Sequence, residues 1–142
     1  MNSLLYHKKQ DIKISSLSAI ANVLQEDGSN FYLNLLNNKN YREKDVVTIY
    51  IRRYCKSDGV PTICDRIKKI LSRKRGRLVV FRREDRTEST ELVQNIEFLS
   101  KYYPKFPVIE ETYKFIEKKW DHIHDSEKKD IRDVIDYSRS QV

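Results

Sequence analysis

One short stretch of the sequence concentrates the side chains that could bind a polyanion. Residues 64–86, CDRIKKILSRKRGRLVVFRREDR, hold ten arginines and lysines against three acids. Guanidinium and ammonium groups at this density produce a local positive potential that attracts phosphates or anionic headgroups. The ten candidates for contact with nucleic acid are Arg66, Lys68, Lys69, Arg73, Lys74, Arg75, Arg77, Arg82, Arg83 and Arg86.

The excess positive charge of the chain is confined to this stretch. The net charge is +7, yet outside residues 66–86 the chain has eighteen basic and nineteen acidic residues. A solvated surface ordinarily intersperses both signs, whereas no acid occurs from Arg66 to Arg83. The alternative is that basic residues near a helix C-terminus only complement the helix dipole. The absence of interspersed acids favours polyanion binding.

A helix over residues 61–75 is expected to position the first half of the stretch. Apolar residues recur there at helical spacing, Thr62 and Asp65 form a capping pattern, and Gly76 stands where a C-cap belongs. On a helical wheel Arg66, Lys69 and Arg73 fall within about 60 degrees of one another, beside the apolar arc. We therefore predict that the helix docks by one side and presents a basic ridge on another.

The elements around this helix suggest how it would meet DNA. Residues 41–55 fit a helix better than a strand, although β-branched residues make that segment ambiguous, and Asp58-Gly59 makes a turn before the next helix. This is the arrangement that a helix-turn-helix needs to lay its second helix in a major groove. Residues 77–83, RLVVFRR, are predicted as a short strand that resembles the first half of a wing, which indicates a winged-helix variant.

The rest of the chain is predicted to be helical. We expect a mainly α fold in a single domain, 1–142, as a compact bundle of about six helices with a helix-turn-helix-like pair and one short β element. Its basic centre spans 41–86, and an acidic helical part spans 87–142. The predicted elements outside the basic centre are helices at 15–26 and 29–37, a loop or hairpin tip at 84–89, a helical stripe that Pro104 and Pro107 terminate, a packing seam from Ile109 to Ile123, and a last helix capped by Ser126.

The sequence holds no catalytic signature. It has no P-loop, no dinucleotide fingerprint and no G-x-S-x-G motif, so we expect neither catalysis nor a cofactor. The segment from Asp121 to Asp125 contains His122 and His124, but no other Cys or His stands at metal-ligand spacing. We interpret it as the polar end of a helix and expect no metal.

Cysteine usage and hydropathy indicate an intracellular protein. Cys55 and Cys64 lie among apolar neighbours and are expected to be buried free thiols in a reducing compartment. No apolar run reaches the length of a membrane span, and lysines occur where a signal peptide would be apolar. The cluster RKRGR also matches nuclear-import signals, which leaves nucleus and cytoplasm both open.

The predicted function is nucleic-acid binding, with duplex DNA favoured over RNA, in a regulatory or architectural and non-catalytic role. Arg66, Lys69 and Arg73 are the candidates for base contacts, and the other basic residues would hold phosphate. RNA binding is the nearest alternative, with Phe81 as a stacking residue.

Two further classes stay open. A small basic viral matrix-type or assembly protein would use the patch on anionic membrane or RNA, and a composition low in glycine hints at an AT-rich, viral genome. An adaptor would contact a protein partner through the Trp120 helix and the C-terminal helices. The sequence does not decide whether the chain forms a homo-oligomer.

Overall fold

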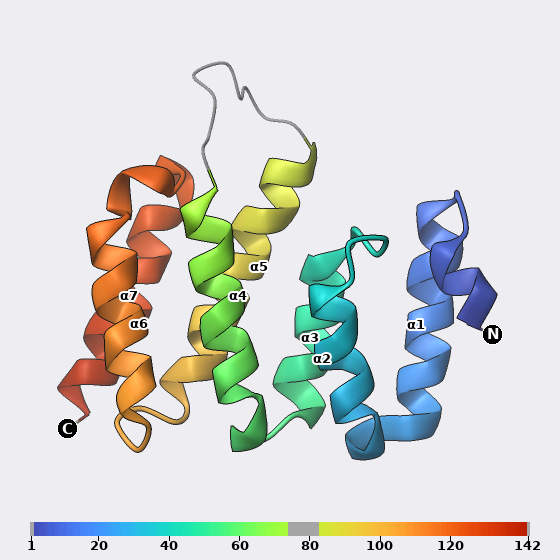
Figure 1. The fold of residues 1–142 in the computed structure, drawn as a ribbon, viewed down its shortest axis with the longest axis horizontal. Coiled ribbons are helices and arrows are strands. Elements are labelled where there is room, and N and C mark those ends of the chain that lie inside the picture. The colour runs from blue at the N-terminus through green and yellow to red at the C-terminus, as the bar shows by residue number, and fades with distance from the viewer. Residues whose placement is uncertain (1, 74–82, 142) are drawn as a thin grey trace. The chain divides into compact units, whose positions relative to one another are not determined.

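The computed structural model of this chain is helical throughout the part that it describes, residues 2–73 and 83–141, where side chains are described from residue 4 to 73 and from 90 on (Figure 1). Among these residues there are seven α-helices and no β-strand. The α-helices are α1 (Gln10–Leu24), α2 (Ser29–Asn37), α3 (Lys44–Tyr54), α4 (Val60–Ser72), α5 (Arg83–Ser100), α6 (Pro107–Lys118) and α7 (Asp125–Ser140). Short 3-10 helices are η1 (Asn2–Tyr6), η2 (Gln25–Gly28), η3 (Ser57–Gly59) and η4 (Trp120–His122). The predicted mainly α fold is confirmed.

Contacts among the described residues divide the chain into two compact units, Met1–Gly59 and Val60–Val142. Each is treated by itself below. The two helices of the predicted helix-turn-helix, α3 and α4, belong to different units. The helix-turn-helix geometry and the single domain therefore stay predictions.

The first unit is built on the packing of α2 against α3, with η2 touching α1, α2 and α3. The side chain of Lys44 holds the end of α2, because its Nζ donates to the carbonyl oxygens of Leu35, at 2.6 Å, and of Asn38. A buried ammonium is tolerated there because it satisfies carbonyl groups that a helix C-terminus leaves without partners. The fully or nearly buried apolar side chains include Leu5, Leu17, Ile20, Ala21, Tyr32, Leu33, Leu35, Leu36, Tyr41, Val47, Ile51 and Cys55.

Three sequence predictions in this unit can be compared with the structure. The helix at 29–37 has the predicted bounds, and the ambiguous segment 41–55 does form a helix, α3. The helix predicted at 15–26 begins earlier, at Gln10, and ends at Leu24, because Gln25 adopts a positive φ of 48°. Helical periodicity therefore located these elements, and only the ends of α1 and α3 differ.

The second unit surrounds α4, which packs against both α5 and α6, while α7 packs against α5 (Figure 1). Isoleucines and leucines at helical spacing supply the core on every helix. Among them Ile63, Ile67, Ile96, Leu99 and Ile131 are completely buried. The helix predicted at 61–75 is observed as Val60–Ser72, so Thr62 lies inside the helix and not at its cap.

Two further secondary-structure predictions in this unit were wrong. Residues 84–89 were expected to form a loop, but they lie within the first half of α5. Their charge suggested solvent exposure, yet Glu84 and Asp85 stand in a first helical turn, where the helix dipole favours acids. The predicted cap at Ser126 is also displaced, because α7 begins at Asp125 with His124 as its N-cap residue.

The predicted helical stripe forms α5, which ends at Ser100, before Tyr102 and Tyr103, which the stripe was expected to include. Pro107 is the first residue of α6, where its missing N–H costs no hydrogen bond. The predicted strand at 77–83 lies outside the described residues except for Arg83, which begins α5.

Candidate nucleic-acid interface

Helix α4 has one buried side and one exposed side. Its isoleucines, Val60, Leu71 and Cys64 are all at most 1 % exposed, whereas Lys69 is exposed and Lys68 is half-buried. Arg73, which follows the last turn of the helix, is also exposed. The exposed side also holds one acid, Asp65. This division agrees with the predicted amphipathic helix and leaves the side chains of Lys68 and Lys69 on its accessible side.

Arg66 departs from the prediction that it lies on an exposed ridge. Its side chain is only 5 % exposed, and its Nε and Nη2 donate to the two carboxylate oxygens of Glu91 at 2.7 and 3.0 Å. The Nδ2 of Asn95 donates to the same carboxylate at 3.3 Å. A buried guanidinium needs such a partner, so Arg66 joins α4 to α5 and is not available for base contacts.

The helical wheel explains why this burial was missed. Arg66 lies within about 60 degrees of both Ile63 and Ile70 and so borders the apolar arc as closely as it borders Lys69. Its acidic partner comes from 25 positions later in the chain. The available signal was Glu91 itself, a charged residue directly before the apolar stripe that starts at Leu92.

Lys68 and Lys69 are the basic residues of α4 that can contact a phosphate most directly. Within the described part of the chain neither makes a salt bridge, although Asp65 precedes Lys69 by one helical turn. An unpaired ammonium on a helix surface can approach phosphate without first breaking an ion pair.

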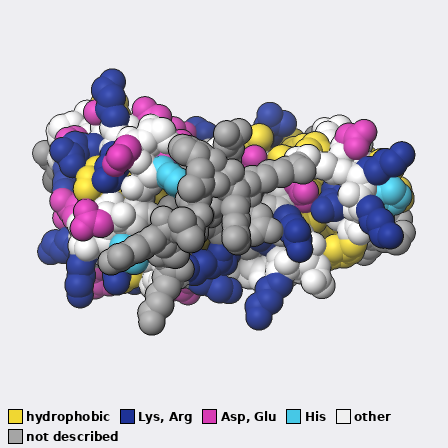
Figure 2. All heavy atoms as spheres, turned by 90° about the horizontal axis from the view of Figure 1, so that it is seen from above, with side chains coloured by type: hydrophobic (Ala, Val, Ile, Leu, Met, Phe, Trp, Pro, Cys, Tyr) yellow, Lys and Arg dark blue, Asp and Glu magenta, His cyan; other side chains and the backbone are white. Residues whose placement is uncertain are grey.

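The remaining candidate residues cannot be placed against α4. Lys74, Arg75, Arg77, Arg82 and Phe81 lie outside the described residues. Arg83 and Arg86 are in α5, and their side chains belong to the part that is not described. In the view of Figure 2, the described surface carries both basic and acidic side chains.

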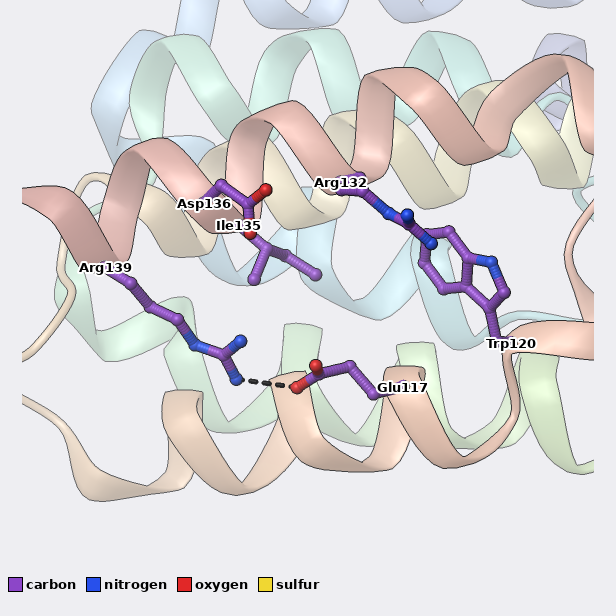
Figure 3. Close-up of a pocket in the computed structure, with 6 residues that line it drawn as sticks. All are labelled: Glu117, Trp120, Arg132, Ile135, Asp136 and Arg139. Atoms are coloured by element: carbon purple, nitrogen blue, oxygen red, sulfur yellow. Dashed lines mark hydrogen bonds and ion pairs between the residues drawn. The ribbon is translucent and has the colours of Figure 1, made fainter.

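A pocket in the same unit was not anticipated from the sequence. It has a volume of about 340 Å³ and is lined by residues of α6, η4 and α7 (Figure 3). The lining residues are Glu117, Trp120, Arg132, Ile135, Asp136 and Arg139. Arg132, Asp136 and Arg139 follow i, i+4, i+7 spacing, which puts them on one face of α7. That spacing could have indicated a polar face on this helix, but it does not reveal which helix lies opposite and completes the pocket.

Arg139 closes one end of the pocket by joining α7 to α6. Its Nη2 lies 2.7 Å from Oε1 of Glu117 and 3.0 Å from Oε1 of Glu110, and its Nε lies 3.3 Å from Oε2 of Glu110. The guanidinium also lies 5.7 Å from the ring centroid of Tyr113. The hydrogen bond to Glu117 raises the pKa of Arg139 further above neutrality. Arg139 is thus a charge that two carboxylates neutralise.

The opposite end holds a planar aromatic surface. The guanidinium of Arg132 lies 4.9 Å from the ring centroid of the half-buried Trp120, and Figure 3 shows the two side chains against each other. Ile135, only 3 % exposed, lies between the two ends. Among the described residues no partner hydrogen-bonds or ion-pairs with Asp136. The pocket therefore combines a stacking surface with an unpaired carboxylate.

Other classes of site were sought in the described residues. They contain no group of three His, Cys, Asp or Glu side chains that could hold a metal ion, and this includes the segment with His122 and His124. None of the described helices is both long and apolar enough to cross a bilayer. Cys55 and Cys64 are buried and free, as predicted.

Comparison of the chain with protein-family models, with curated proteins and with solved structures finds no match. The function is therefore argued from the residues of this chain alone.

Proposed function

We propose that the protein binds nucleic acid, with duplex DNA preferred, through the exposed side of α4 and the basic residues that follow it. The observation that carries the proposal is the division of α4 into an apolar side buried in its own unit and an accessible side bearing Lys68, Lys69 and Arg73. The chain continues from Arg73 into Lys74, Arg75 and further basic residues without an acid until Glu84.

Simple electrostatics supports this partner. Each phosphate neutralised by Lys or Arg releases condensed counterions, so a run of basic residues gains affinity without reading sequence. Lys69 of α4 and Arg73, which directly follows the helix, are the side chains from which we expect base contacts, and Lys68 is suited to phosphate. Arg66 is no longer part of this set, because Glu91 occupies its guanidinium.

The role that follows is regulatory or architectural and not catalytic. It requires the protein to meet nucleic acid in the nucleus or the cytoplasm. A helix-turn-helix formed by α3 and α4 and a wing at 77–83 belong to this proposal as predictions, and the binding argument does not depend on them.

The test is a charge reversal with a matched control. Lys68→Glu/Lys69→Glu should abolish binding of a short fluorescent duplex in an anisotropy titration, because it turns two expected phosphate contacts into repulsions. The control is Lys128→Glu/Lys129→Glu, which makes the same charge change on α7, where these lysines pair with Asp125 and Asp133.

Both variants should keep the helical circular-dichroism spectrum, since all four lysines lie outside the buried core. The proposal is wrong if the α4 variant binds the duplex as tightly as wild type. It is equally wrong if both variants lose affinity to the same degree, because only net charge would then matter.

A further inference from the structure

The pocket between α6 and α7 has the composition of a site for one nucleobase. We propose that it binds guanine, either as an unpaired base of a nucleic acid or as a free guanine nucleotide. The nucleic-acid source rests on the proposed function, whereas recognition of the base itself depends only on the pocket. The volume of about 340 Å³ lies within the range of small-ligand pockets.

The first feature of the pocket that suits a nucleobase is a surface for stacking. Unpaired bases stack on aromatic rings and on guanidinium planes, and the pocket offers both in Trp120 and Arg132. The guanidinium carbon lies 4.9 Å from the ring centroid, which is a cation–π contact, so a base would stack on the outer face of one of the two side chains. Ile135 gives an apolar wall beside it.

The second feature is a carboxylate, that of Asp136, which can recognise the edge of a base. An ionised carboxylate only accepts hydrogen bonds, and Asp136 has no partner among the described residues. Guanine presents two adjacent donors, N1–H and the N2 amino group, which match the two oxygens of one carboxylate. Adenine and cytosine place a ring-nitrogen acceptor beside their amino group, and uracil flanks its N3–H with carbonyl oxygens. Only guanine therefore meets Asp136 without repulsion.

The third feature is the pairing of the other charged side chains that line the pocket. Glu117 and Arg139 satisfy each other, together with Glu110, so neither is free to compete for the base or to attract its phosphate. Arg132 is exposed and is the cation of the lining that can approach a phosphate group. We therefore expect recognition mainly through the base, with affinity that depends less on salt than binding at α4.

The chain supplies its own reporter, because Trp120 is its only tryptophan. Intrinsic fluorescence of the full-length protein is titrated with GMP, AMP, CMP and UMP, and with guanosine to separate base from phosphate. GMP and guanosine should quench Trp120 saturably, with GMP bound at a Kd on the order of 1 mM or below. The other three nucleotides should bind at least about fivefold more weakly.

Asp136→Asn is the decisive variant, and Asp130→Asn on the exposed surface of the same helix is its control. The first should weaken GMP binding by about fivefold or more, and the second should leave it unchanged. Circular dichroism of both variants verifies the fold. No saturable quenching, equal affinity for all four nucleotides, or unchanged GMP binding by Asp136→Asn would each overturn the proposal.

Two further arms identify the source of the base and separate this site from α4. A single-stranded oligonucleotide with one guanine assigns the site to nucleic acid if it quenches Trp120 at lower concentration than GMP does and the same oligonucleotide with adenine in place of guanine does not; equal affinity of oligonucleotide and GMP assigns it to the free nucleotide. Lys68→Glu/Lys69→Glu should still bind GMP. If the wild-type protein does not bind duplex DNA while GMP still quenches Trp120, the pocket stands and the proposed function does not.

Discussion

At the scale of single residues, the pairing of Arg66 with Glu91 decides what α4 can offer a ligand. Both side chains are at most 5 % exposed, and two hydrogen bonds join them. Breaking such a buried pair leaves an uncompensated charge in the core. Arg66 therefore contributes to the stability of the second unit and not to the surface of α4.

This assignment predicts a difference between a single and a double substitution. Arg66→Met should lower the free energy of unfolding by about 3–5 kcal/mol, because Glu91 stays buried without its partner. Arg66→Met/Glu91→Leu should recover most of that loss, apart from about 1–3 kcal/mol for the Asn95 amide that loses its acceptor. Urea denaturation measures both.

The nucleic-acid affinity of the double variant tests whether Arg66 also contacts the ligand. The affinity for duplex DNA should equal that of wild type, since Arg66 makes no contact with ligand. A stable double variant with clearly weakened binding would show that Arg66 leaves the core to reach nucleic acid.

A second residue prediction concerns the Cys55 thiol. Burial raises its pKa to about 11, partly opposed by a hydrogen bond with the Ser29 side chain. A thiol whose pKa is higher in the folded than in the unfolded chain keeps its proton preferentially when folded. Its contribution to stability is complete below pH 9 and is lost as the pH rises to about 11.

Thiol titration checks the burial of Cys55, and alkaline denaturation checks its contribution to stability. At pH 8 the folded protein should react with a disulfide reagent at Cys55 only after opening, and Cys55→Ala should show a smaller loss of stability between pH 9 and 11 than wild type. Immediate reaction at pH 8 would contradict the burial of this thiol.

At the scale of elements, α4 shows what a sequence pattern can and cannot predict. Its apolar period fixed its buried side, because every apolar position is spaced for one face. The pattern could not place Arg66, which stands at the border of that face, since the choice depends on an acid that another helix brings. The loop expected at 84–89 failed for a related reason, because charged residues suit a solvated helix as well as a loop.

The pocket could be predicted from the sequence even less than the position of Arg66, because it depends on how several elements face one another. Its residues come from α6, η4 and α7, and its shape depends on how these elements face one another. Trp120 was expected in a packing seam with Ile116 and Ile123, which are indeed buried. Because α6 ends at Lys118 and η4 follows, the indole is only half-buried and lines the pocket.

The accessible side of α4 makes a quantitative prediction about salt. Lys68→Gln/Lys69→Gln removes two positive charges, so the slope of log affinity for duplex DNA against log salt should become shallower by about 2. Lys128→Gln/Lys129→Gln should leave the slope unchanged. An α4 variant with the wild-type slope would show that neither lysine contacts phosphate.

At the scale of the whole molecule, the division at Gly59 predicts where the binding activity resides. The second unit, Val60–Val142, holds α4 to α7 with their own buried core. A fragment of residues 60–142 should therefore fold, as seen by cooperative thermal unfolding in circular dichroism.

The same fragment contains all ten predicted contact residues. It should bind duplex DNA within about threefold of the full-length affinity, a difference of less than 1 kcal/mol. A folded fragment that does not bind would mean that residues 1–59 supply essential contacts.

The most direct test of the central claim compares four partners for the full-length chain as salt is raised. Affinity is measured for duplex DNA, single-stranded DNA, duplex RNA and anionic vesicles. We expect the tightest binding to duplex DNA, with a steep linear fall of log affinity against log salt. Tighter binding to anionic vesicles than to any nucleic acid, or no binding to duplex DNA at low salt, would contradict it.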